Sequence, residues 1–210
     1  MYAWNELQDL SVKPRINDIS LQTLQTYYDN TLYPFFFHYH IQETSAERKS
    51  IELRFNRENF CHLLGIEKIM RNSTSAANIS NYKGLRGWEN IKNGQYDILD
   101  LRRANRRRFA SAKAKYVYFY LIPKLIQDPR AVLFENTRAE GNVSIESEIL
   151  FYSNVENDRA IIHLGIDKTD NEYYIPRTFF VEKVDSFEND GYIRNQAPIS
   201  VTVEDRTITL

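Results

Sequence analysis

The chain has 210 residues, of which 42% are hydrophobic and 26% charged, a balance that fits one globular domain with a buried core. Its single cysteine, Cys61, excludes an intrachain disulfide and favours a reducing compartment, so we expect a cytoplasmic protein. We expect neither a membrane span nor a signal peptide, because the apolar runs fall far short of about 20 residues and the amino terminus lacks a basic region and an apolar core.

The net charge of −1 hides a strong separation of charge along the chain. Eight basic residues and no acidic residue lie between Leu101 and Gln127, so this window carries +8 and the rest of the chain −9. A basic segment on an acidic body indicates a polyanionic partner. We therefore expect nucleic acid rather than a small-molecule cofactor.

The amino-terminal quarter predicts a helix followed by a short hairpin. Apolar side chains recur at helical spacing over residues 18–30, and Asp18 or Ser20 can cap this helix. Two runs at 35–41 and 50–55 have strand character and are joined by polar residues that serve as a turn. We expect the two strands to pair with each other.

The next segment predicts short helices and then a loop. Asn56 can cap a helix over residues 57–64, and Gly65 stands where a left-handed residue ends it. A second helical stretch follows through Met70. Residues 72–95 combine three glycines with Ser, Asn and Lys, and we interpret them as a long surface loop.

From Tyr96 to Gln127 the pattern is that of one long basic helix, which Pro129 ends. Short β-rich runs separated by turns then predict an antiparallel meander. These runs are residues 131–135, 145–153, 160–167 and 172–175. The predicted fold class is therefore α+β, in a single domain over residues 1–210. Residues 1–16 are expected to be a flexible arm, and residues 186–210 a tail with an edge strand.

The absence of several sequence motifs excludes the kinds of site that depend on them. The chain has no GxGxxG and no P-loop, and no HExxH or CxxC, so we expect no nucleotide cofactor and no metal. His38 and His40 point to one face of their strand, where they are metal ligands, a functional pair or, as we expect, ordinary histidines. His163 in IIHLGID is expected to be structural.

Five arginines in seven positions give the basic segment its character, because guanidinium groups match phosphates well. The alternative is a solvated helix face that pairs with acidic residues elsewhere in the chain. We expect contact with nucleic acid. The predicted nucleic-acid-binding residues are Arg102, Arg103, Arg106, Arg107, Arg108 and Lys113.

Two short motifs carry a family resemblance. The first follows a strand and contains Phe60, His62, Leu63, Leu64 and Gly65. The second comes late and contains Tyr173, Tyr174, Pro176, Thr178, Phe179 and Phe180. Together they resemble the phage and mobile-element nucleases of the Barnase–EndoU–colicin–RelE fold group, over roughly residues 20 to 185. The chain departs from that pattern at Thr178, where serine is expected.

The resemblance implies a metal-independent endonuclease, usually acting on RNA. It implies His62 as acid or base, Arg177 and Thr178 as phosphate contacts, and Tyr174 as a residue that stacks on a base or positions phosphate. The alternatives are a core histidine at position 62 and a turn that closes the sheet at Arg177 and Thr178. The activity would be that of a toxin or of a defence or mobile-element effector, with a cognate antitoxin or inhibitor protein as partner.

A second resemblance leads to the same class of activity. Arg57 and His62 satisfy R-x4-H, which resembles the motif of helical RNases, but the β-rich half argues against an all-helical fold. Two further hypotheses are a non-catalytic module that binds nucleic acid or protein, as a regulator or inhibitor, and a structural or assembly protein. The sequence leaves the oligomeric state open.

Overall fold

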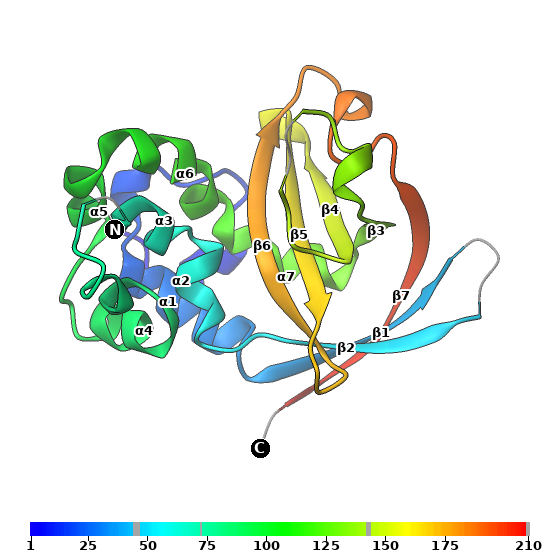
Figure 1. The fold of residues 1–210 in the computed structure, drawn as a ribbon, viewed down its shortest axis with the longest axis horizontal. Coiled ribbons are helices and arrows are strands. Elements are labelled where there is room, and N and C mark those ends of the chain that lie inside the picture. The colour runs from blue at the N-terminus through cyan, green and yellow to red at the C-terminus, as the bar shows by residue number, and fades with distance from the viewer. Residues whose placement is uncertain (44–46, 72, 142–143, 209–210) are drawn as a thin grey trace. The chain divides into compact units, whose positions relative to one another are not determined.

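The computed structural model (Figure 1) describes residues 1–43, 47–71, 73–141 and 144–208. The chain divides into two compact units. Residues 1–33 and 56–121 form the helical unit, and residues 34–55 and 122–210 form the sheet unit. The predicted α+β class is confirmed. That the whole chain is one domain stays a prediction, and each unit is described by itself.

The helical unit contains α-helices joined by short 3-10 turns. The α-helices are α1 (Leu21–Thr31), α2 (Asn59–Leu63), α3 (Ile66–Met70), α4 (Gly84–Lys92), α5 (Ile98–Ala104) and α6 (Arg106–Tyr118). The 3-10 turns are η1 (Asn5–Asp9), η2 (Ile16–Asp18), η3 (Ile79–Tyr82) and η4 (Phe119–Leu121). None of the helices in the described part of the chain is long and apolar enough to cross a membrane.

An aromatic cluster forms the core of the helical unit. The Tyr28 ring of α1 lies 5.4 Å from Phe60 and 5.7 Å from Trp88 between ring centroids, and it is fully buried. Its hydroxyl donates a hydrogen bond to the Asn56 carbonyl at 2.7 Å. The predicted cap at Ser20 is confirmed, because its side chain accepts from the Thr23 N–H at 2.9 Å. The cluster ties α1, α2 and α4 together.

The predicted long basic helix is wrong, because the segment is broken into α5, α6 and, in the sheet unit, α7 (Ile122–Gln127). Asn105 is extended, with φ −153° and ψ 90°, and its side chain accepts from the Arg108 N–H at 3.0 Å. Asparagine competes with the helical backbone in this way, so it ends α5 and caps α6. The arginines on the two sides of Asn105 therefore do not share one helical face.

The predicted surface loop at 72–95 is also wrong, because it contains α4 with Trp88 and Ile91 buried. Gly87 has no room for a side chain, since a Cβ there would lie 2.8 Å from the Cys61 sulfur and 2.8 Å from the Tyr82 carbonyl carbon. Gly87 is thus a packing position, whereas Gly84 at the start of α4 and Gly94 just after it have positive φ. Residues 1–16, expected to be a flexible arm, contain η1 and bury Leu7 completely.

The sheet unit is a closed barrel with the strand order β1-β2-β6-β5-β4-β3-β7. Its strands are β1 (Phe35–Gln42), β2 (Lys49–Arg54), β3 (Arg130–Leu133), β4 (Ile149–Val155), β5 (Ala160–Lys168), β6 (Tyr174–Lys183) and β7 (Ala197–Ile208). The 3-10 turns η5 (Asn136–Arg138), η6 (Glu156–Asp158) and η7 (Phe187–Asn189) lie between them. The predicted hairpin is confirmed as β1–β2, although residues 44–46 of its turn lie outside the described residues.

The predicted meander is confirmed in part. β3, β4, β5 and β6 pair antiparallel in sequence order. The barrel closes in two ways that the sequence did not predict, through a parallel pair at Leu53 and Tyr174 and through β7. The tail does form a strand, but β7 is not an edge, because it pairs with both β1 and β3.

Candidate functional site

His62 is an exposed residue on a short, otherwise buried helix. In α2, Phe60, Cys61 and Leu63 all point into the core, and only His62 faces solvent. Gly65 has φ +69°, and its N–H donates to the His62 carbonyl at 2.9 Å. The interpretation of His62 as a core histidine is therefore wrong, and the imidazole is accessible to a ligand.

Arg57, the other residue of the R-x4-H pattern, is held by an ion pair and an aromatic contact. Its guanidinium donates to both carboxylate oxygens of Asp29, at 2.8 and 3.0 Å, and lies 4.3 Å from the centroid of the Tyr33 ring. A bidentate ion pair and an aromatic contact of this kind fix the side chain in place. The presence of a closed barrel also argues against the helical RNase resemblance.

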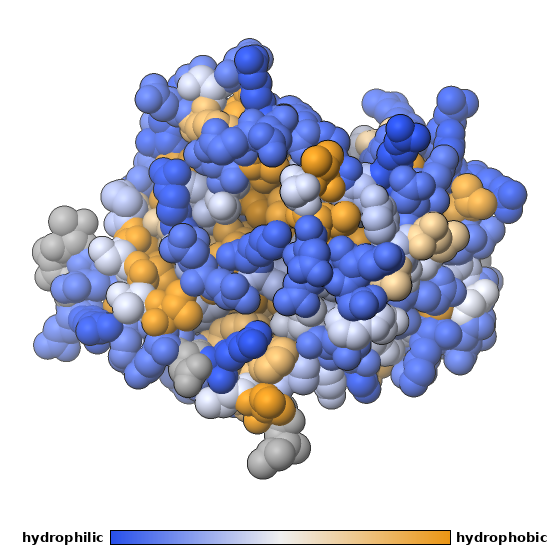
Figure 2. Space-filling view, turned by 180° about the vertical axis from the view of Figure 1, so that it is seen from behind, coloured by the Kyte–Doolittle hydropathy of each residue, from blue (hydrophilic) through white to orange (hydrophobic). Residues whose placement is uncertain are grey.

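The arginines of the basic segment divide into two groups. Arg102, Arg103 and Arg106 line one open cavity of about 440 Å³ together with Leu99. Arg107 and Arg108 line another. Arg103 pairs with Asp100 at 3.5 Å, whereas Arg102, Arg106, Arg107 and Lys113 make no ion pair within the described ranges. On the face drawn in Figure 2, hydrophilic side chains cover most of the surface and apolar ones gather in smaller patches.

The second cavity, here called the Lys115 cavity, has a volume of about 620 Å³. It is lined by Gly65, Lys68, Ile69, Asn105, Arg107, Arg108, Ser111, Ala112 and Lys115. Four of these residues are cations and none is an acid. Burial, and then the charge of Lys68, lower the pKa of Lys115 to about 8. Neither Lys68 nor Lys115 was predicted as a site residue, because only the fold brings α3 against α6.

In the sheet unit, the predicted residues of β6 lie around a β-bulge. Gly165 pairs with Thr178 and Ile166 with Pro176, so Arg177 is an extra residue in its strand. Bulges of this kind redirect a side chain and are common beside active sites. Arg177 is exposed and lies 3.8 Å from Asp167, while Thr178 is half-buried.

The hydroxyl of Tyr174 donates a hydrogen bond to Glu148 at 3.2 Å. Burial raises the pKa of Tyr174, and the charge of Glu148 raises it further, so the phenol stays protonated. Glu148 itself is exposed. It was missed by the sequence reasoning because only the β4–β5–β6 pairing brings it to the late motif.

Gly165 explains how the chain accommodates threonine at position 178. A Cβ on Gly165 would lie 2.6 Å from the Thr178 methyl carbon and closer still to the Ser147 hydroxyl oxygen. The absence of a side chain at Gly165 therefore lets two hydroxyl-bearing residues approach each other across β5. The extra methyl that distinguishes Thr178 from the expected serine occupies this space.

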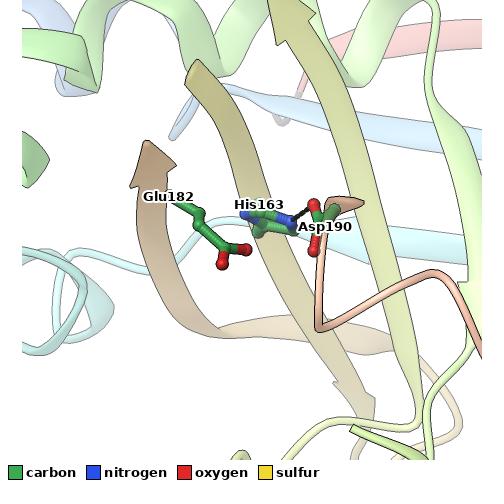
Figure 3. A group of neighbouring side chains, drawn as sticks. All are labelled: His163, Glu182 and Asp190. Carbon is green, nitrogen blue, oxygen red and sulfur yellow. Dashed lines mark hydrogen bonds and ion pairs between the residues drawn. The ribbon is translucent and has the colours of Figure 1, made fainter. Parts of the chain in front are cut away.

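A separate cluster of titratable side chains is buried in the sheet unit (Figure 3). His163 of β5 and Asp190, after η7, are both fully buried, and Nε2 of His163 lies 2.6 Å from Oδ2 of Asp190. Asp190 also accepts from the Tyr192 N–H at 2.8 Å. The His163 ring stacks on Phe180, with centroids 4.3 Å apart. This arrangement fits the structural role expected of His163.

Glu182 of β6 completes the cluster, and its carboxyl holds a proton near neutrality. Burial, followed by the nearby charge of Asp190, raises the pKa of Glu182 to about 7. Burial also acts to raise the pKa of Asp190, but the hydrogen bond and charge of His163 outweigh it, so that pKa lies below its ordinary value. Within the described residues, Nδ1 of His163 and Oε2 of Glu182 have no hydrogen-bond partner.

The same three residues are the natural candidates for a metal ligand set. One ligand atom from each lies within 4.8 Å of the others. The 2.6 Å contact between His163 and Asp190, however, has the length of a charge-assisted hydrogen bond. His163 and Asp190 thus form a hydrogen-bonded pair.

The predicted catalytic residues fall into two sets. His62 belongs to the helical unit, where its turn borders the Lys115 cavity through Gly65. Tyr174, Arg177 and Thr178 belong to the sheet unit, where all three lie on β6, with Tyr174 buried, Thr178 half-buried and Arg177 exposed. That both sets act on one phosphodiester stays a prediction.

Comparison with known proteins gives one match. The profile of a family described as phage-Barnase-EndoU-ColicinE5/D-RelE like nuclease 4 matches residues 21–202. No curated protein and no solved structure matches the chain. The matched range includes both short motifs, the basic segment and all of the strands except the end of β7. The chain therefore belongs to the phage-Barnase-EndoU-ColicinE5/D-RelE like nuclease 4 family.

Proposed function

We propose that the protein is a metal-independent endoribonuclease that acts as a toxin or as a defence or mobile-element effector. The observation that carries the proposal is a set of cations in the helical unit that no carboxylate of the described residues neutralises. They are Arg102, Arg106, Arg107, Lys113 and Lys115. Such a surface binds a polyanion, and the family supplies the expectation that this polyanion is cleaved.

The proposed chemistry uses the ribose as its own nucleophile. The 2′-oxygen attacks phosphorus and the bond to the 5′-oxygen breaks, which leaves a 2′,3′-cyclic phosphate and a free 5′-hydroxyl. One group takes the proton of the 2′-hydroxyl, and another gives a proton to the leaving oxygen. The imidazole of His62 is assigned one of these steps, because it is exposed and an imidazole can either accept or donate a proton.

The β6 residues are assigned to the phosphate. The guanidinium of Arg177 and the hydroxyl of Thr178 would stabilise the charge that develops on the phosphoryl oxygens. Tyr174 is buried, so of the two roles that the resemblance implies it would position phosphate through its hydroxyl, which Glu148 holds, and would not stack on a base. Glu148 is a carboxylate in reach of the same region, which makes it a candidate for the other proton transfer.

The experiment incubates the purified protein with RNA in EDTA. We expect cleavage to 2′,3′-cyclic phosphate ends, and none of a matched oligonucleotide in which deoxyribose replaces ribose. His62→Ala should lower the rate by about 10²- to 10⁴-fold with an unchanged circular dichroism spectrum. The matched control is His40→Ala, which removes a half-buried histidine of β1.

Three results would count against the proposal. Cleavage that requires added divalent metal would contradict metal independence, and equal cleavage of the deoxy oligonucleotide would contradict the role of the 2′-hydroxyl. RNA that is bound but stays intact would favour the non-catalytic binding module instead. A toxin role predicts in addition that expression of wild-type protein, but not of His62→Ala, stops growth of a bacterial host.

A further inference from the structure

We infer that the Lys115 cavity is a phosphate-binding subsite, with Lys115 and Lys68 as contacts for the backbone of the RNA strand. The inference rests on the proposed function for the identity of the ligand. It adds two residues that neither the sequence motifs nor the basic segment's arginines indicated. It also gives Gly65, three residues after His62, a role in the site.

Gly65 and Lys115 lie against each other. A Cβ at Gly65 would lie 3.9 Å from both Cδ and Nζ of Lys115, so the lysine side chain passes over the glycine backbone. The positive φ of Gly65 disfavours any other residue at this position. The turn at Gly65, which follows α2, therefore leaves room for the ammonium group of Lys115. The cavity borders α2, the helix that presents the His62 imidazole.

The charges around the cavity are all of one sign. Lys68 comes from α3, and Arg107 and Arg108 come from α6, as does Lys115 itself. Arg108 is fixed in place, because it donates a hydrogen bond to the Lys68 carbonyl at 2.6 Å. Burial, and then repulsion by the charge of Lys68, lower the pKa of Lys115. A bound phosphate would remove the repulsion.

The extent of the charged surface favours a strand over a single nucleotide. Arg107 and Arg108 of α6 line the Lys115 cavity, and Arg106 of the same helix lines a second cavity with Arg102 and Arg103. The first turn of α6 thus contributes arginines to both cavities. A polynucleotide can place phosphates in both cavities, whereas a mononucleotide fills only one.

The test measures binding of a single-stranded RNA with 2′-O-methyl groups, which removes the attacking hydroxyl. We expect Lys115→Met to weaken binding roughly 10-fold near pH 7 and to lower the salt slope by about 0.7, the loss of one phosphate contact. The matched control is Lys92→Met at the end of α4, an exposed lysine outside both cavities, which should bind as wild type.

Lys115→Arg supplies a readout that loss of structure would not imitate. Wild-type affinity should fall as the pH rises from 7 to 9, because the ammonium group loses its proton near its pKa of about 8. The arginine variant keeps its charge and should bind with much less dependence on pH over this range. The measurement stays decisive if Lys115→Met fails to fold.

The outcomes separate this inference from the proposed function. Wild-type affinity and pH dependence in both Lys115 variants would overturn the subsite, even if RNA is cleaved. Lys115-dependent binding without any cleavage would sustain the subsite and overturn the nuclease proposal. Competition by free pyrophosphate as strong as competition by the RNA strand would overturn the assignment to a polynucleotide.

Discussion

The two units differ in where these charged groups lie and in whether they are paired. In the helical unit, cations such as Arg106 and Lys113 stay at the surface without a carboxylate partner in the described part of the chain. In the sheet unit, His163 and Asp190 are fully buried and bonded to each other. The difference follows from solvation, because an exposed cation keeps its water whereas a buried charge must find a partner. The buried pair is therefore satisfied within the fold, whereas the exposed cations remain available to a partner outside it.

The largest expected effect is the loss of the buried pair. His163→Leu should destabilise the protein by about 3–5 kcal/mol, because it leaves the Asp190 carboxylate buried without its hydrogen-bond partner. The free energy of unfolding from urea titration measures this effect. The matched surface variant, Arg106→Gln, should change stability by no more than about 0.5 kcal/mol. A loss below about 1 kcal/mol in His163→Leu would show that the pair is solvated in solution.

The elements that could be predicted from sequence are those with a local signal. The helix α1 has a capping serine and apolar residues at helical spacing, and β1 and β2 have strand character on both sides of a polar turn. The meander of β3 to β6 could be predicted in part, since turn residues separate short apolar runs, although the fourth run, 172–175, covered only the start of β6. These patterns do not depend on contacts with distant parts of the chain.

The features that could not be predicted depend on distant contacts or on one competing residue. Asn105 sits in a helical pattern and still breaks it by capping α6. The glycines of α4 suggested a loop, because the sequence does not show that Cys61 and Tyr82 fill the space beside Gly87. Lys115 and Glu148 became candidates only through their neighbours in space, Lys68 and Tyr174.

A second, smaller effect tests the buried cluster through pH. The folded state holds the Glu182 proton up to a pKa of about 7, above its ordinary value of 4.5, so the folded state binds more protons between these values. Stability should therefore be greatest below pH 4.5 as far as Glu182 is concerned, and should fall as the pH rises toward 7. Glu182→Gln should remove this decline, which we expect to be on the order of 1–2 kcal/mol after screening by solvent.

The comparison between wild type and Glu182→Gln removes the contribution of other groups. Asp190 acts in the opposite direction, because its lowered pKa adds stability that is lost only as the pH falls through that value. Unfolding measured at pH 5 and pH 8 lies above that range. If the difference in stability between the two proteins is the same at both pH values, Glu182 is not protonated in the folded state.

The smallest expected effect returns to the helical unit and compares a free arginine with a paired one. Arg106→Gln should lower the dependence of RNA affinity on salt by about 0.7, because one phosphate contact releases fewer counterions. Arg57→Gln should leave that slope unchanged, since Asp29 already neutralises the guanidinium, although the variant should lose stability. Equal salt slopes for both variants would mean that RNA binding depends on the total charge rather than on the unpaired cations. Measuring affinity at several salt concentrations with 2′-O-methyl RNA separates the two cases, because a paired arginine can bind phosphate only by first giving up its carboxylate.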